Sequence, residues 1–233
     1  MYVAANAFVG PLVQVAATMS LGSLALVARR DRHGRIASGA DEDAALASLF
    51  AALGAAVACA LVVGLWPVVA VLFPTHVGTI RNLGIVLALF LPLRFLNFAF
   101  SALLVARGGA ARRLWIVAGT TALNVTLNLA FDGHLGAFGA AWATVLTEVG
   151  VTALFVLSLR AVRVGAPVAV IVATVGAASV WAAIALRGGS APGALVAPIA
   201  GVMFVGGAAC AVLSQRAMRP RFGTATPIAI TAT

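Results

Sequence analysis

Residues 83–106 read LGIVLALFLPLRFLNFAFSALLVA, an apolar run suited to the hydrocarbon core of a bilayer except for one charge near its midpoint, Arg94. A helix of about 20 apolar residues is long enough to cross the hydrocarbon core of a bilayer. A charge at the bilayer centre costs at least ~2.5–3.5 kcal/mol, and such residues usually face a cavity or a partner. The stretch therefore predicts a membrane-spanning helix whose arginine faces a cavity or a partner. Pro92 removes a backbone hydrogen bond and is expected to bend this helix.

The whole chain has the composition of a membrane protein. Of its 233 residues, 63% are hydrophobic and 9% are charged, whereas soluble domains carry roughly 25% charged residues. Cys59 and Cys210 lie inside apolar runs and are expected to pack as small side chains. The sequence contains no nucleophile elbow, phosphate-binding loop or metal-ligand spacing. We therefore expect a protein that is not an enzyme and has no cofactor.

Seven apolar runs of helical length predict an all-α fold, a polytopic membrane helix bundle with about seven transmembrane helices. These runs are long and continuous, whereas transmembrane strands are short and alternating. The expected spans are residues 2–28, 44–73, 83–106, 114–131, 137–159, 168–186 and 194–213.

The basic residues fall in alternate connections between these spans. All fifteen are arginines, of which twelve lie on one side and two on the other. Because arginine-rich loops stay in the cytoplasm, we expect the N-terminus outside and the C-terminus in the cytoplasm of a cell inner or plasma membrane. The net charge is +9, but the basic residues do not form a surface interleaved with aromatic residues. We therefore expect no nucleic-acid partner. Residues 214–233 are expected to form a disordered cytoplasmic tail.

Polar residues inside the spans form stripes with the period of a helix. Arg94, Asn97 and Ser101 share one face of the third span, and Glu148 stands at the middle of the fifth. One internal cavity shared by the first five spans explains this distribution. The other stripe residues are Asn6, Gly10, Gln14 and Thr18 in the first span, Asn124 and Asn128 in the fourth, and Thr144 and Thr152 in the fifth.

Three interpretations of the charges remain open. Arg94 and Glu148 lie at similar depth, so they can form a structural ion pair, just as polar residues in membrane helices often only bond to neighbouring helices. Alternatively, they line a wet cavity in which the planar guanidinium binds phosphate oxygens. The two interpretations are compatible, because an anion can open the pair. A misplaced span is a third interpretation.

The chain resembles the polysaccharide flippases, of the O-antigen and lipid II type, in the multidrug/oligosaccharidyl-lipid/polysaccharide exporter superfamily. The resemblance lies in YVAANAFVGPLVQVAATMSLGSLALVARR from Tyr2, in LPLRFLNFAFSALLVARGGAARR (residues 91–113), and most clearly in ALNVTLNLAFDGHLGAFGAAWATVLTE (residues 122–148). The matching positions are Asn124, Asn128, Gly139, Ala140, Ala141, Ala143, Thr144 and Glu148.

The resemblance implies a lobe of a transporter that turns lipid-linked sugars to the outer leaflet for cell-surface polysaccharide or lipopolysaccharide synthesis. Residues 1–160 form the lobe-like part, and 161–213 add two transmembrane helices. Family members have twelve to fourteen spans, so the resemblance implies a truncated or split C-terminal half. A separate N-terminal lobe or a second copy would complete it. The position of Arg94 has no general counterpart in the family, and its role is inferred from its depth.

The leading hypothesis is the C-terminal lobe of a flippase for polyprenyl-diphosphate-linked oligosaccharide, in contact with membrane lipids. Arg94 would hold the diphosphate, and Glu148 would pair with it or take part in ion coupling. The alternative is a non-transporting membrane scaffold of a polysaccharide assembly complex. A membrane glycosyl- or acyltransferase is disfavoured, because no catalytic acid or histidine stands on a loop with supporting partners. The predicted substrate-binding residues are Gln14, Arg94, Asn97, Asn124 and Asn128.

Overall fold

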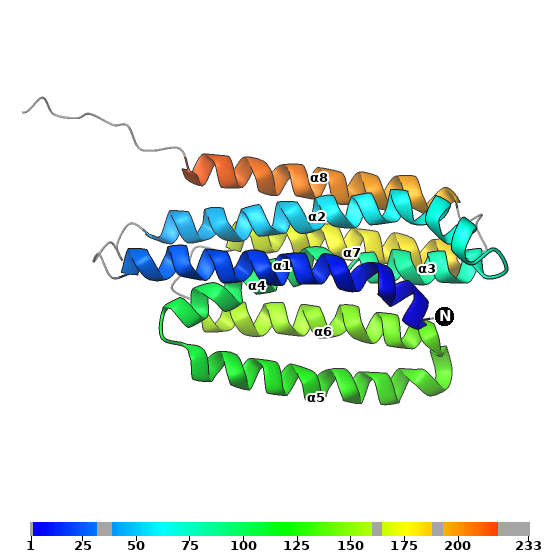
Figure 1. Cartoon of the computed structure of the whole chain (residues 1–233), viewed down its shortest axis with the longest axis horizontal. Coiled ribbons are helices and arrows are strands. Elements are labelled where there is room, and N and C mark those ends of the chain that lie inside the picture. Colours follow the sequence, from blue (N-terminus) through cyan, green and yellow to red (C-terminus); the bar gives the residue numbers. More distant parts are fainter. Residues whose placement is uncertain (1, 32–38, 160–164, 188–192, 219–233) are drawn as a thin grey trace, which may run out of the picture.

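The computed structural model describes residues 2–31, 39–159, 165–187 and 193–218, and these contain helices and turns but no strand. Figure 1 shows the helices lying side by side along one long axis. The helices are α1 (Tyr2–Asp31), α2 (Gly39–Leu72), α3 (Val77–Ala88), α4 (Leu91–Ala106), α5 (Ala110–Leu135), α6 (Ala137–Ser158), α7 (Gly165–Arg187) and α8 (Gly193–Met218).

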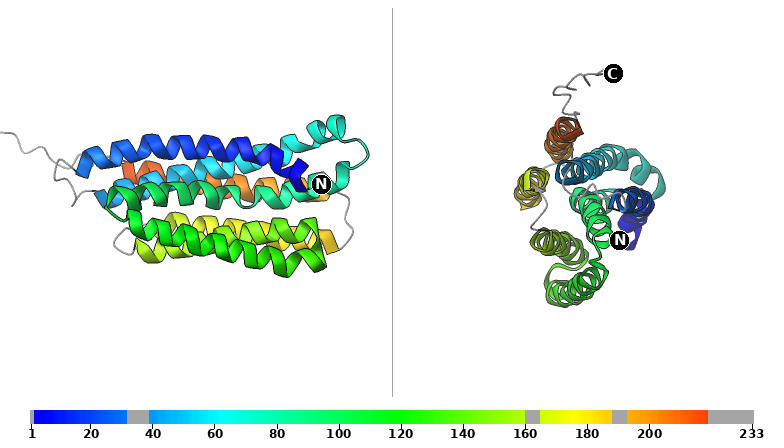
Figure 2. Two further views of the ribbon diagram at one scale, coloured as in Figure 1. Left: turned by 60° about the horizontal axis from the view of Figure 1, so that its bottom comes forward. Right: turned by 90° about the vertical axis from the view of Figure 1, so that its left-hand side faces the viewer.

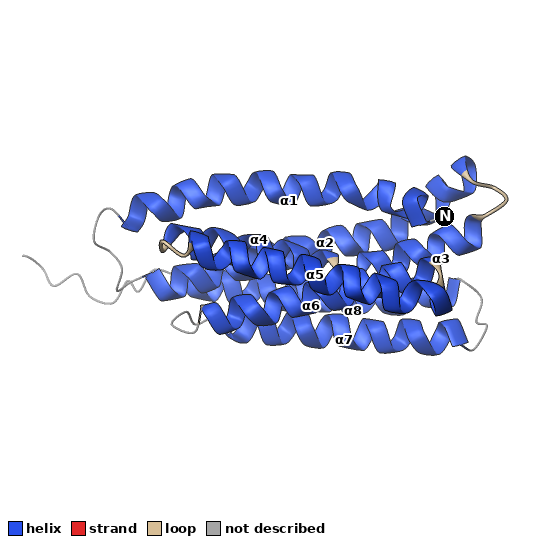
Figure 3. Ribbon diagram, turned by 90° about the horizontal axis from the view of Figure 1, so that it is seen from below, coloured by secondary structure: helices blue, strands red, loops and turns tan. Residues whose placement is uncertain are grey.

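The helices alternate in direction, and α3 and α4 together form one interrupted rod (Figures 1 and 3). The all-α prediction is confirmed. Six stretches of the described residues are long and apolar enough to cross a membrane, whereas the apolar stretch Val168–Ser179 of α7 is shorter. Which end faces the cytoplasm stays a prediction. The six are Tyr2–Leu24, Glu42–Leu65, Val77–Ala106, Ala110–Leu135, Ala137–Ser158 and Pro198–Gln215.

The α3–α4 rod is the centre of the bundle, and 89% of its apolar window is buried. The sequence predicted one bent helix here, but the structure has two helices joined at Leu89 and Phe90. A continuous helix would bring the ring of Pro92 against the carbonyl of Ala88. Instead, Pro92 stands in the first turn of α4, where a missing N–H costs nothing.

Several predicted boundaries are wrong, because helices continue into expected loops. The expected loop 74–82 contains the start of α3, which buries Arg81 to 4% exposure. The expected turn 132–136 is mostly the last turn of α5, and the chain reverses at Gly136, whose φ of 52° suits glycine. At the C-terminal end, α8 continues through Met218, and the rest of the expected tail lies outside the described residues.

Helix packing leaves α1 and α5 at the margin of the bundle. The central rod contacts α1, α2 and α6, α8 packs along α2, and α7 packs on α8. In contrast, α5 packs mainly on α6, and only 11% of its apolar window is buried. The end view in Figure 2 shows α4 and α6 lying between α1 and α5. These four helices carry the polar stripes of the first, third, fourth and fifth predicted spans.

The crossing of α2 over the central rod depends on Gly54. A Cβ at Gly54 would lie 2.8 Å from Phe95 Cβ and 2.9 Å from Pro92 Cα. We predict that Gly54→Ala lowers the unfolding free energy by about 1–3 kcal/mol, because overpacking forces the backbone apart. Gly64→Ala on the same helix is the matched control, since its Cβ would meet nothing within 4 Å. Unfolding in detergent, followed by tryptophan fluorescence, measures both, and equal stabilities would contradict the prediction.

Candidate functional site

A cavity of about 600 Å³ lies among α1, α4, α5 and α6. Residues of α4 and α6 form its floor, and residues of α1 and α5 border it. Each helix contributes a polar side chain: Asn6 from α1, Arg94 from α4, Asn124 from α5 and Glu148 from α6. A volume of this size is typical of sites for small molecules, roughly 300–1,000 Å³.

An ion pair crosses the floor of the cavity. Arg94 Nη1 lies 2.7 Å from Glu148 Oε1, and the two side chains are 39% and 6% exposed. The guanidinium also lies over the ring of Phe98, at 5.2 Å from its centroid, a contact that favours a cation. The carboxylate is therefore buried, while the guanidinium faces the cavity.

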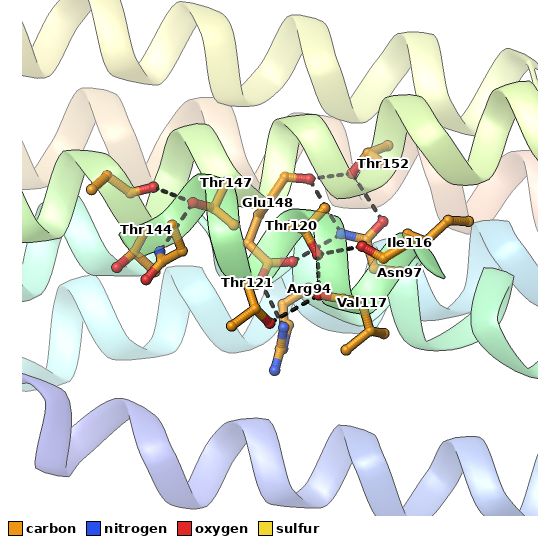
Figure 4. A network of polar contacts seen from close by, with 12 residues as sticks. Arg94, Asn97, Ile116, Val117, Thr120, Thr121, Thr144, Thr147, Glu148 and Thr152 are labelled. Atoms are coloured by element: carbon orange, nitrogen blue, oxygen red, sulfur yellow. Dashed lines mark hydrogen bonds and ion pairs between the residues drawn. The ribbon is translucent and has the colours of Figure 1, made fainter. Parts of the chain in front are cut away.

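The second carboxylate oxygen of Glu148 is held by α4 as well. Asn97 Nδ2 donates to Oε2 at 2.9 Å, and Thr152 Oγ1 donates to Asn97 Oδ1 at 3.0 Å. Figure 4 shows this chain of contacts running between the two helices. It forms because residues three apart on α4 meet residues four apart on α6, so each pair shares a helix face. The contacts orient the carboxylate toward Arg94.

Asn124 connects α5 to α6 beside this ion pair. Its Nδ2 donates to Thr147 Oγ1 at 3.0 Å, and Asn128 Nδ2 donates to Asn124 Oδ1 at 3.0 Å. Asn124 lines the cavity, but Asn128 does not. Asn128 therefore orients a residue of the cavity lining.

The structure brings together four of the six predicted site residues, Arg94, Asn97, Asn124 and Glu148, around one cavity. Gln14 and Asn128 do not line this cavity, and their predicted role in binding a substrate stays a prediction.

Gln14 does not line the cavity because the helical period of α1 turns its side chain away. Val13 is seven residues from Asn6, which places it about 20° from Asn6 around the helix, whereas Gln14 is about 80° away. The side chain of Val13 lines the cavity, and Gln14 is exposed.

Sequence reasoning missed Arg113, which lines the cavity from the first turn of α5. Its Nε donates to Ser101 Oγ at 2.5 Å. The predicted span began at residue 114, so Arg113 was assigned to a loop and explained by topology alone. Extending the helix back to Ala110 places Arg113 about 20° from Asn124 around α5, and this shared face was the available signal.

The arrangement can bind an anion through guanidinium and hydroxyl donors. Among the described residues, no group of three or more His, Cys, Asp or Glu side chains could hold a metal ion. No family model, curated protein or solved structure matches the chain. A functional proposal therefore rests on this geometry and on the sequence.

The unequal burial of the ion pair predicts unequal effects of removing each partner. Arg94→Gln leaves the Glu148 carboxylate buried and unpaired, which costs about 3–5 kcal/mol. Glu148→Gln costs less, because water in the cavity can solvate the 39% exposed guanidinium. The double variant is expected to regain most of the loss of Arg94→Gln. Unfolding free energies in detergent, compared as a double-mutant cycle, measure this, and equal losses in the two single variants would argue against it.

Proposed function

We propose that the chain is a substrate-binding lobe of a transporter for polyprenyl-diphosphate-linked oligosaccharides in the inner or plasma membrane. The transported lipid would serve cell-surface polysaccharide synthesis. The observation that carries the proposal is the partly exposed guanidinium of Arg94, held in a cavity beside the middle of α6. A membrane protein that keeps a charge at this depth usually uses it on a substrate or ion pathway.

Charge and donor chemistry support an anionic ligand. The cavity is lined by two arginines, Arg94 and Arg113, and by one carboxylate, Glu148. A guanidinium has five N–H donors in a planar fork that matches phosphate oxygens. Figure 4 shows the guanidinium of Arg94 pointing away from α6, toward the side that α1 borders. A diphosphate in the cavity could therefore accept hydrogen bonds from Arg94 without entering the protein core.

The rest of the lining supports a sugar beside the diphosphate. Asn6, Asn124, Thr121 and Thr144 line the cavity with amides and hydroxyls, which can donate to and accept from sugar hydroxyls. The choice of a lipid-linked oligosaccharide rests on the sequence resemblance of residues 91–113 and 122–148 to polysaccharide flippases.

The open side of the cavity supports a partner lobe. The cavity opens between α1 and α5, which make few contacts with each other in the described part of the chain. Polar groups facing hydrocarbon without partners are unfavourable. We therefore include in the proposal a second lobe, either a separate N-terminal one or another copy of this chain, that covers this side during transport.

A non-transporting scaffold is the second candidate, and one observation favours it. Both carboxylate oxygens of Glu148 already accept hydrogen bonds within the chain. A purely structural ion pair needs nothing more. In that case the site would bind no diphosphate.

Binding of farnesyl diphosphate to the purified protein in nanodiscs separates the two candidates. We expect Glu148→Gln to bind several-fold more tightly, because the carboxylate no longer competes for Arg94. The Arg94→Gln/Glu148→Gln variant should bind roughly 10- to 100-fold more weakly, since hydrogen bonds to charged groups contribute about 1.5–3 kcal/mol. This double variant keeps the buried site neutral, so a loss of binding cannot be assigned to an unpaired buried charge.

Arg112→Gln is the control for loss of an arginine outside the cavity, because Arg112 does not line it. Its affinity is expected to equal that of the wild type. If all these variants bind farnesyl diphosphate equally, or none binds it, the transporter proposal fails and the scaffold is favoured. Flipping of a fluorescent polyprenyl-diphosphate sugar by co-reconstituted lobes then tests transport itself.

A further inference from the structure

Two guanidiniums line the cavity at different depths. Arg113 donates from Nε to Ser101 Oγ at 2.5 Å. Ser101 follows Arg94 by seven residues on α4, which corresponds to about 10 Å of helical rise. Arg113 therefore stands about two turns from the ion pair, toward the end of the bundle where α4 ends and α5 begins. We call this the arginine-rich end, and its residues are Arg107, Arg112 and Arg113.

The two cavity arginines differ in their partners. Arg94 is neutralised by Glu148. Within the described residues, the Arg113 side chain has one hydrogen-bond partner, the hydroxyl of Ser101, and no ion pair involves it. A hydroxyl fixes the orientation of a guanidinium but does not neutralise it. Arg113 is also exposed, so its remaining N–H groups can meet a ligand.

The other two arginines of this end are placed differently. Arg107 forms an ion pair with the buried carboxylate of Asp43 on α2. Arg112 donates from Nη1 to the carbonyl oxygen of Ser158 at 3.4 Å and lies outside the cavity lining. Of the three, Arg113 alone combines a place in the described cavity with the lack of a carboxylate partner.

We propose that Arg113 is the first anion-binding position of the cavity. A diphosphate group arriving from the arginine-rich end binds Arg113 before it displaces Glu148 from Arg94. This inference rests on the proposed binding of a diphosphate in the cavity and adds the order of events. The order follows from the partners: binding at Arg113 breaks no ion pair, whereas binding at Arg94 competes with a carboxylate at 2.7 Å.

The two positions have different kinetic roles. An unneutralised charge at the mouth of a cavity attracts a charged ligand and can raise association rates by roughly 10–10³-fold. A charge that holds the bound ligand instead controls how fast it leaves. Arg113 therefore sets mainly the association rate constant, and Arg94 sets mainly the dissociation rate constant.

Stopped-flow binding tests this division, with the full chain in nanodiscs of zwitterionic phospholipid so that no anionic head group competes. The probe is a fluorescent isoprenoid diphosphate, and unlabelled inorganic pyrophosphate is the competitor. We expect Arg113→Gln to lower the association rate constant about 10-fold at low salt, with a dissociation rate constant within about twofold of the wild type. Arg113→Lys, which keeps the charge, should retain most of the association rate.

Arg112→Gln is the matched control, because it removes the same charge from the neighbouring residue. Equal slowing by Arg112→Gln and Arg113→Gln would overturn the inference, since a general field at this end would then explain the effect. A change confined to the dissociation rate in Arg113→Gln would also overturn it.

The arms of this experiment separate the inference from the proposed function. If the wild type binds neither probe, the proposed function fails and the inference fails with it. If the wild type binds but Arg113→Gln behaves like the wild type, only the inference fails. Displacement by inorganic pyrophosphate shows that the diphosphate is recognised, and tighter binding of the isoprenoid form identifies the lipid-borne source.

Discussion

A carboxylate placed in the middle of a membrane helix has to be neutralised, and the arrangement of the site follows from how Glu148 is neutralised. Its side chain is 6% exposed, and donors on α4 hold both oxygens. An ionised carboxylate without these donors would be strongly unfavourable in a medium of low dielectric constant. The requirement fixes the register of α4 against α6, because Arg94 and Asn97 must both reach one carboxylate. The floor of the cavity is therefore set by electrostatics as well as by packing.

The two members of the ion pair are not equivalent, and this difference connects structure to function. Glu148 lies inside the protein, whereas the guanidinium of Arg94 has one side toward the cavity. A pair buried on both sides would stabilise or specify the fold and do nothing else. A pair with an exposed cation keeps N–H donors accessible to water or an anion. The structural role of the pair and its proposed role in binding a ligand are therefore compatible.

Sequence periodicity predicted the helices and the residues at mid-depth, because both follow from the spacing of residues along one chain. It could not fix how a helix is rotated against its neighbours, which depends on packing. Gln14 illustrates this limit: the polar stripe suggested it, but the face of α1 toward the cavity passes through Val13.

The residues at which helices begin and end were the second feature that the sequence did not predict. Arginines near an end were explained by membrane topology, so Arg113 was assigned to a loop and its place on the cavity face of α5 was missed. Arg81 was placed in an outer loop for the same reason, although α3 carries it into the protein interior. The sequence locates a charge along the chain. It does not show which neighbours pack around an arginine that lies near a helix end.

The central rod shows why surroundings decide the role of a charge more than residue type does. Arg81 on α3 and Arg94 on α4 belong to the same interrupted rod, and both lie within one apolar stretch, Val77–Ala106. The segment α3 is enclosed by α1, α2 and α6, and Arg81 is 4% exposed. Beyond the break at Leu89 and Phe90, α4 has the cavity on one side, and Arg94 reaches it. A ligand can therefore approach Arg94 without unpacking the core, whereas access to Arg81 would require α3 to separate from its neighbours.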